Sequence, residues 1–483
     1  MIVGPQPDGS TADLTLDDLF RRAAVNNPDG LALADPPDRS AFTTGVPKAL
    51  TFAETDRAIW SAAARLRTLG LPADAIVAFQ LPNIVESIVT LLGIQRAGMI
   101  AAPLPMLWRE TEIVAALSEL GAKALLTVAR INDADHCAIA MNAAAGLFSI
   151  RHVCAFGPHL PHGVADFDNL AAADAVAPLT SRRPDESRHA AVVTFEATTH
   201  GPRPVVRNHH QVIAGGMAAL GGRPFENGIG LLSAIPVSSL AGLALTVAPW
   251  LRLGGPLILH QPFDADRFFA QQRQYGCRLV SVPGALARPA AHRIRATEAP
   301  LDGVLGLWRA PDRASADETV DDDVLIDVEA FGEFGLRAHT RRHRDGDVPG
   351  PTLLVPQRSP SGTLLLSGAM VAPARLPGAD VAPSDGAIDT GYPCGAAVND
   401  LAVTAAQPAM VAVGGYRIPC ADIEAVAASL PSGSVITALP DALLGQRLTG
   451  TADDVAQTER SLAERGNSPL ISQAFRRRGA AAA

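Results

Sequence analysis

Short apolar segments alternate with helix-like segments along most of this chain, and this alternation restricts the fold more than any other feature. Residues 75–80, 99–103 and 122–128 are apolar runs that predict buried strands, and segments with helical spacing lie between them. The same pattern returns at 256–260 and 279–282. Strands that alternate with helices are joined by crossovers, which build parallel sheets. The sequence therefore predicts an α/β fold with parallel-type sheets and flanking helices.

The texture of the sequence changes in the last third. Short strands separated by Pro, Ser and Gly turns are expected from Leu353 to Leu366, and they predict a β-rich subdomain beside the sheets. From about Gln407 a small α+β module begins. A chain of 483 residues is too long for one small core. We therefore predict a large domain over residues 1–406 and a small C-terminal domain over residues 407–483.

Composition and charge exclude several classes of protein. Hydrophobic residues make up 48% of the chain, which is typical of a globular protein, and the net charge of -9 disfavours a nucleic-acid partner. The five cysteines are scattered without C-x-x-C spacing, which disfavours a zinc site and fits a reducing cytoplasm. No secretory signal is visible, and the apolar segment 231–259 is interrupted by Ser, Pro and Arg. We expect a cytoplasmic protein with no membrane span and no metal site.

One segment has the spacing of a phosphate-binding loop. It follows the predicted strand 190–194 and contains Thr198, Thr199, Gly201 and Arg203. Such loops use small residues so that backbone N–H groups turn toward phosphate. Glu196, however, places a carboxylate where a small neutral residue is expected, at a cost of about 1–4 kcal/mol per charge pair beside a triphosphate. Two interpretations stay open, a working phosphate grip and an ordinary loop between two strands.

The order and spacing of several short segments resemble the adenylate-forming superfamily of acyl- and aryl-CoA synthetases over nearly the whole chain. These segments are Leu50–Glu54, Leu81–Asn83, Arg96–Gly98, Pro103–Leu104, Ile235–Pro236, Ala241–Gly242, Gly414–Ile418 and Ala421–Glu424. The resemblance implies a large N-terminal domain, here with two sheets, and a small mobile C-terminal lid. It also implies that a carboxylate reacts with ATP and magnesium to give an acyl-adenylate, from which a thiol, commonly coenzyme A, displaces AMP.

The resemblance assigns roles to individual positions of this chain. Glu333, in Glu329–Gly335, matches the acid that positions magnesium and is the catalytic candidate, although an exposed turn carboxylate is the alternative interpretation. Tyr392 stands at the ribose clamp. The remaining assignments are an adenine shelf at Trp308, Arg309, Ala310 and Pro311, and an acyl pocket that includes Ser239, Ala241 and Gly242. Trp308 and Arg309 either fill the slot for the base or point away from it, and Trp308 is alternatively a core residue.

Several of these positions depart from the family pattern. Tyr392 replaces an aspartate and cannot accept hydrogen bonds from two ribose hydroxyls. The hinge segment Ala405–Ala409 has lost its charged residues, and Pro408 restricts rotation there. No lysine follows Lys123, so the adenylation lysine of the lid is missing unless one of the arginines in 476–478 replaces it.

Three functions remain open from the sequence. The one we favour is a synthetase-like protein that acts on or binds an acyl or aryl carboxylate, or its thioester, without standard ATP-dependent adenylation. The alternatives are a divergent but active AMP-forming acid–CoA ligase and a non-catalytic protein that binds a protein partner. The cofactors are therefore unknown, with ATP, magnesium and coenzyme A implied by the family alone. Scattered histidines, Ser239 without a nucleophile elbow, and Cys394 give no stronger hypothesis.

Overall fold

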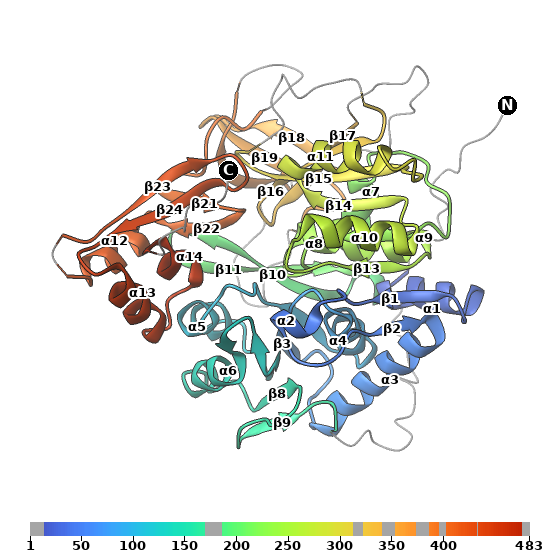
Figure 1. Ribbon diagram of the computed structural model, residues 1–483, viewed down its shortest axis with the longest axis horizontal. Helices are drawn as coiled ribbons and strands as arrows, with labels where there is room; N and C mark the ends of the chain where they lie inside the picture. Colours follow the sequence, from blue (N-terminus) through green and yellow to red (C-terminus); the bar gives the residue numbers. More distant parts are fainter. Residues whose placement is uncertain are drawn as a thin grey trace.

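The computed structural model describes residues 14–169, 186–312, 322–340, 353–372, 386–395, 402–431 and 433–475. Two large sheets dominate these residues. In Figure 1 the N-terminal sheet lies in the lower half, the second sheet extends from the upper part down to the lower right, and the C-terminal residues, in red, lie at the left. The predicted α/β class is confirmed.

The N-terminal sheet has the strand order β11-β10-β4-β3-β5-β8-β9. Neighbouring strands pair in parallel except β10 and β11, which form an antiparallel hairpin. The strands are β3 (Ile76–Gln80), β4 (Ile100–Pro103), β5 (Ala124–Val128), β8 (His152–Phe156), β9 (Val164–Asp166), β10 (Ala190–Thr198) and β11 (Gly201–Asn208). The hairpin therefore forms one edge of this sheet.

The second sheet has the order β17-β16-β15-β14-β12-β13-β1-β2, parallel except for its two outer pairs. Its strands are β1 (Leu31–Ala34), β2 (Ala49–Thr51), β12 (Leu231–Ser233), β13 (Leu257–Leu259), β14 (Leu279–Pro283), β15 (Gly303–Arg309), β16 (Leu325–Phe331) and β17 (Gly335–Thr340). The turn between β16 and β17 carries Glu333, so the candidate acid lies where the chain reverses direction at the edge of this sheet.

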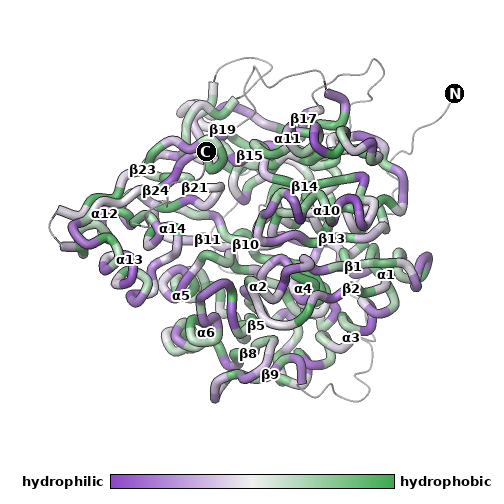
Figure 2. The backbone as a smooth tube through the Cα atoms, viewed as in Figure 1, coloured by the Kyte–Doolittle hydropathy of each residue, from purple (hydrophilic) through white to green (hydrophobic). Residues whose placement is uncertain are grey.

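Helices cover the two sheets, and several begin at capping boxes. Thr15, Thr51 and Asn208 each accept a hydrogen bond from the backbone three residues on, which satisfies an N–H group at the helix start. The helices are α1 (Leu16–Asn26), α2 (Arg39–Phe42), α3 (Phe52–Thr68), α4 (Val85–Arg96), α5 (Glu110–Ser118), α6 (His136–Ala145), α7 (His209–Ala219), α8 (Leu240–Gly242), α9 (Ala248–Leu253), α10 (Ala265–Tyr275) and α11 (Gly284–Arg295), with a short 3-10 turn η1 (Glu186–Arg188). Figure 2 shows apolar residues concentrated where these helices meet the strands.

Residues 240–253 form one continuous helical segment that changes its hydrogen-bonding pattern. A π-helical segment, η2 (Leu243–Val247), lies between α8 and α9. Pro249 follows it, and proline provides no N–H for a regular helical hydrogen bond. All five residues of η2 are buried. Helix α11 is likewise continuous despite Pro289 inside it.

The β-rich subdomain and the C-terminal residues form two smaller sheets. The first contains β18 (Val355–Arg358), β19 (Thr363–Ser367) and β20 (Ile388–Pro393). The second has the order β22-β21-β24-β23. Its strands and the helices beside it are β21 (Met410–Val413), β22 (Tyr416–Pro419), α12 (Cys420–Ala428), β23 (Val435–Asp441), β24 (Gly445–Thr451), α13 (Val455–Glu464), α14 (Pro469–Ser472) and η4 (Gln473–Phe475). Residues 410–475 enclose their own apolar cluster, which includes Leu462 and Phe475.

Short elements were harder to predict than the buried strands. The sequence interpretation did not include β1 or the small ribbon of β6 (Arg130–Ile131) and β7 (Ala134–Asp135). Within the described ranges, no helix is both long enough and apolar enough to cross a membrane.

A buried histidine predicts acid sensitivity. His136 has no exposed surface, and its Nδ1 lies 2.9 Å from Oε1 of Gln80. Burial, with a smaller contribution from Arg109, lowers the pKa of His136 from 6.5 to about 3. Below its unfolded pKa, the unfolded chain binds a proton that the folded chain does not. The contribution of neutral His136 to the free energy of unfolding is therefore fully present above about pH 6.5. It decreases as the pH falls toward 3, by up to about 1.4 kcal/mol per pH unit.

We expect the wild-type protein to lose about 2 kcal/mol from this histidine between about pH 7.5 and pH 5, and His136→Asn to remove that part of the loss. Urea denaturation of both proteins at about pH 7.5 and pH 5 measures it. An equal loss in the two proteins would contradict the assignment, and His260, whose pKa is also lowered by burial, would then be examined in the same way.

Candidate functional site

The predicted phosphate loop is a tight hairpin. Strand β10 continues through Thr198, beyond the expected end at Thr194, and Thr198 pairs with Gly201 at the first residue of β11. The Thr198 hydroxyl donates to the carbonyl of Gly201 at 2.8 Å and accepts from the N–H of His200 at 3.2 Å. Gly201 has φ +98°, which favours glycine. Thr198, Thr199 and Gly201 thus lie together in the turn, and Arg203 is exposed on β11.

Glu196 lies in the interior behind this turn. The residue is 2% exposed, and its Oε2 accepts a hydrogen bond of 2.6 Å from the backbone N–H of Glu333. Its Oε1 forms an ion pair with Nη1 of Arg417, which belongs to β22 in the C-terminal sheet. The carboxylate that disturbs the phosphate-loop pattern is therefore bound by a cation from the distant end of the sequence.

Arg417 has three further contacts. Its Nη1 donates to the Tyr392 hydroxyl at 3.0 Å and to Oε1 of Gln407 at 2.8 Å, and its guanidinium lies 5.8 Å from the centre of the Tyr392 ring. Burial alone would lower the pKa of Arg417, but the negative charge of Glu196 more than compensates and raises it. The guanidinium is therefore charged and enclosed by Glu196, Tyr392 and Gln407.

Glu333 is buried between the hairpin and the acyl-pocket segment. Its Oε2 accepts a hydrogen bond of 2.8 Å from the N–H of Leu240 and lies 3.6 Å from Nη1 of Arg207. Burial raises the pKa of Glu333, and the positive charge of Arg207 offsets only part of this effect. Glu333 is 7% exposed, so the alternative of an exposed turn carboxylate is wrong.

The predicted adenine shelf is partly strand. The turn was expected after Leu307, but β15 continues through Trp308 and Arg309, because both residues pair with β16. The Trp308 Nε1 donates to Asp327 at 2.8 Å, and its ring packs so closely on Gly284 that a Cβ there would overlap it. Arg309 packs in the same close manner on Gly415 of the C-terminal sheet.

The end of the shelf is a tight bend. Ala310 donates its N–H to the carbonyl of Ala330 at 2.9 Å, and the peptide bond between Ala310 and Pro311 is cis. The four shelf residues thus lie at the end of β15, with Trp308 directed to α11 and Arg309 to the C-terminal sheet. Sequence reasoning had left the direction of both side chains open.

The ribose-clamp and hinge positions are joined through Arg417. Tyr392 is 1% exposed, and burial raises its pKa to about 12. Gln407, in the segment that replaces the family hinge, donates from Nε2 to the carbonyl of Thr390 at 2.5 Å. Asp389 accepts a hydrogen bond of 2.9 Å from the N–H of Gly391 and so caps the turn before Tyr392.

The acyl-pocket residues form the start of a buried helix. The Ser239 Oγ accepts a hydrogen bond of 3.1 Å from the N–H of Gly242, which makes Ser239 the N-cap of α8. Ala241 and Gly242 are buried, and a Cβ on Gly242 would overlap the carbonyl of Pro236. The hydroxyl of Ser239 is therefore used in capping the helix.

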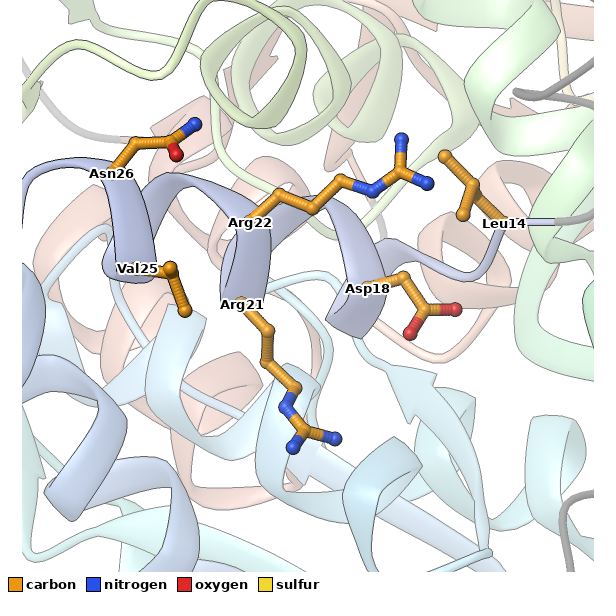
Figure 3. Close-up of a pocket in the computed structure, with 6 residues that line it drawn as sticks. All are labelled: Leu14, Asp18, Arg21, Arg22, Val25 and Asn26. Atoms are coloured by element: carbon orange, nitrogen blue, oxygen red, sulfur yellow. The ribbon is translucent and has the colours of Figure 1, made fainter.

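Other candidate groups have no comparable setting. Among the residues that the structure describes, no three His, Cys, Asp or Glu side chains gather as metal ligands. Cys394 is buried, and burial raises the pKa of its thiol above the usual range in spite of Arg358 nearby. The arginines at 476–478 lie outside the described residues. A surface hollow of about 470 Å³ is lined by α1 and Leu14 alone (Figure 3), and none of the predicted site residues borders it.

The central cluster of the site is thus Thr194, Glu196, Arg207, Glu333, Tyr392, Gln407 and Arg417. Sequence reasoning singled out Glu196, Glu333 and Tyr392 in this cluster. It gave no role to Arg207, Gln407 or Arg417, although Arg417 lies in the segment that carried the resemblance of the lid.

Comparison with known proteins identifies the family. The family model of the AMP-binding enzymes matches residues 20–322, more than half of the chain. The chain belongs to the AMP-binding enzyme family. Residues 410–475, which contribute Arg417, lie beyond the matched region.

Curated relatives are distant and much longer. The chain is 26% identical over 284 residues to long-chain fatty acid transport protein 1 of Homo sapiens, which covers 57% of this chain and 41% of that protein. It is 24% identical over 347 residues to cyclosporin synthetase of Tolypocladium inflatum, covering 68% of this chain and 2% of the synthetase. The chain thus spans less than half the length of either relative.

Solved structures share the fold over nearly the whole chain. The amide bond synthetase McbA of Marinactinospora thermotolerans is 17% identical, with a TM-score of 0.72 and coverage of 95% of this chain and 94% of that one. MbtA of Mycobacterium smegmatis is 20% identical, with a TM-score of 0.65 and coverage of 95% and 90%. The o-succinylbenzoate CoA synthetase of Bacillus subtilis is 14% identical, with a TM-score of 0.69 and coverage of 94% and 93%. These likenesses establish the fold alone.

Proposed function

We propose that this protein binds or acts on an acyl or aryl carboxylate, or its thioester, without standard ATP-dependent adenylation. One observation carries the proposal. Glu196 stands at the phosphate-loop position and Tyr392 at the ribose position, and both side chains contact Arg417. The backbone N–H at the magnesium-acid position, Glu333, is bound to the same carboxylate of Glu196. At the positions where the resemblance places nucleotide contacts, the groups present in this chain are thus bound to other groups of the protein itself.

The charges around Arg417 do not fit an ATP–magnesium complex. Bringing a triphosphate to the carboxylate of Glu196 costs about 4 kcal/mol per charge pair at 4 Å and an effective dielectric constant near 20. Displacing Arg417 would also leave Glu196 buried without its cation, a loss of about 3–5 kcal/mol. The two lysines of the chain are Lys48 and Lys123. No lysine of residues 124–483 is therefore available to take the part of the family's adenylation lysine.

The segment that the resemblance assigns to the acyl pocket supports the acyl part of the proposal. Ser239, Ala241 and Gly242 lie at the start of a buried helix, and the N–H of Leu240 donates to Oε2 of Glu333 at 2.8 Å. The apolar η2 follows directly. This arrangement supports binding of an apolar acyl or aryl group beside α8, which is the part of the family's activity that the residues still fit.

Thermal-shift measurements test the proposal. We expect ATP with magnesium, or AMP, to leave the melting temperature unchanged at about 1 mM, and an acyl-CoA with a fatty or aryl group to raise it. A ligand at 100 times its Kd adds about 2.7 kcal/mol of stability to the folded state. Free coenzyme A is the matched control for the acyl group.

Pyrophosphate release from ATP, in the presence of fatty and aryl acids, separates the proposal from an active ligase. Acid-dependent release that stops in Glu333→Ala would overturn it. Absence of any shift with acids and acyl-CoAs would also contradict it, and co-purification with a protein partner would then favour the non-catalytic alternative.

A further inference from the structure

A fully buried arginine lies beside the acyl-pocket segment. Arg207 belongs to β11 and has no exposed surface. Its Nη1 donates to the hydroxyl of Thr194 at 2.8 Å and lies 3.6 Å from Oε2 of Glu333. Glu333 in turn accepts from the N–H of Leu240 at 2.8 Å, so one carboxyl group connects Arg207 to the start of α8.

One edge of this guanidinium has no partner. Among the described residues, neither Nε nor Nη2 of Arg207 has a hydrogen-bond acceptor, and both atoms are shielded from solvent. These two nitrogens lie on the same side of the planar fork. Two N–H groups in that arrangement match the two oxygens of a carboxylate.

Such an edge is costly unless an acceptor occupies it. A buried donor without a partner loses the hydrogen bonds that water gives it in the unfolded chain. The other buried cation of the cluster, Arg417, is bound by Glu196, Tyr392 and Gln407. Arg207 is therefore the cation in this cluster with hydrogen-bonding capacity left.

We propose that the Nε–Nη2 edge of Arg207 binds the carboxylate of the acyl or aryl ligand, with the apolar part of the ligand beside α8. This inference rests on the proposed function. It assigns to Arg207 the recognition of the negative charge, since no lysine follows Lys123.

Arg207 is covered on all sides, so the acid enters with a local opening of the segments around it. Binding is therefore measured at equilibrium after long incubation. The probes are octanoate and benzoate, each with its neutral amide, octanamide and benzamide, as a control of nearly the same shape. We expect the two acids to raise the melting temperature of the wild-type protein and the two amides to leave it unchanged.

Two variants of Arg207 test the residue itself. Arg207→Met keeps the length of the side chain without charge, and Arg207→Lys keeps the charge without the fork. We expect each variant to bind the acids at least about tenfold more weakly than the wild type, as removal of a charge-assisted hydrogen bond does. Arg252→Met, at an exposed arginine of α9, is the matched control and should bind the acids as the wild type does.

Each outcome decides the inference. Equal binding of acid and amide, unchanged affinity in both Arg207 variants, or no binding of either acid at about 10 mM would overturn it. If Arg207→Met does not fold, the comparison of acid with amide in the wild type and the Arg207→Lys variant still decide. ATP binding with acid-dependent pyrophosphate release would overturn the proposed function separately, since that assay does not depend on Arg207.

Discussion

Glu196→Ala is expected to lower the free energy of unfolding by about 3–5 kcal/mol, because it leaves the guanidinium of Arg417 charged and buried without its carboxylate. The side chains of Glu196 and Arg417 are 3% and 10% exposed, so water replaces little of the lost interaction. The substitution also removes the acceptor of the Glu333 N–H. The first effect acts on the contact between β10 and the C-terminal sheet, and the second acts on the contact between β10 and the turn from β16 to β17.

A double-mutant cycle separates the ion pair from the packing. Glu196→Ala, Arg417→Met and the double variant are compared by urea denaturation, and hydrogen exchange of β21 and β22 reports on the contact directly. We expect the double variant to lose less stability than the sum of the losses in the single variants. When the carboxylate and the guanidinium are both removed, no unpaired charge stays buried. Faster exchange in β22 is expected in Glu196→Ala.

An exposed ion pair serves as the control for this cycle. Asp266 and Arg293 pair through side chains that are 86% and 48% exposed, so Asp266→Ala should change stability little. A change in Glu196→Ala as small as that of the control, with unaltered exchange in β22, would show that the C-terminal sheet is not held by this pair.

The parallel strands could be predicted from the sequence because burial on both faces makes them continuous apolar runs. The segments expected at 75–80 and 279–282 are β3 and β14 within one residue at each end. Strand β10 was expected to end at Thr194 because Thr198, Thr199 and Gly201 have the spacing of a phosphate-binding loop. Whether the residues after Thr194 continue the strand depends on the groups that they contact in the folded protein, and the pattern of neighbouring residues does not contain this information.

The same limit applies to the site. Glu333 could be identified by its place in a motif, but its burial depends on Leu240 and Arg207, which are far from it in sequence. Glu196 was identified as an anomaly, and its meaning depends on Arg417. An arginine within an apolar strand, such as Arg207, has no local signal that distinguishes a buried cation from an exposed one.

Gly332→Ala is the second substitution with a large expected effect, about 2–4 kcal/mol of lost stability. A Cβ at this position would overlap Oε2 of Glu196 and lie 2.8 Å from Nη2 of Arg417. These side-chain ends cannot move aside easily, because the carboxylate is bound by the Glu333 N–H and by Arg417. The φ angle of +58° adds about 1–2 kcal/mol for a residue other than glycine. Overpacking of a closed interior adds about 1–3 kcal/mol.

The cost should depend on Glu196. In this chain the carboxylate of Glu196 occupies space that the missing side chain of Gly332 leaves free. In a Glu196→Ser background, we therefore expect Gly332→Ala to cost only the backbone contribution of about 1–2 kcal/mol. Urea denaturation of the two single variants and the double variant measures the coupling.

Gly276→Ala is the matched control for the backbone contribution. Gly276 has φ +60°, nearly the same as Gly332, and a Cβ there would meet no heavy atom within 4 Å. The loss of stability in Gly332→Ala beyond that in Gly276→Ala therefore measures the space that the bound Glu196 carboxylate occupies. If the two variants lose the same stability, the carboxylate does not fill the position of the missing side chain, and the ion pair with Arg417 would have to be placed elsewhere.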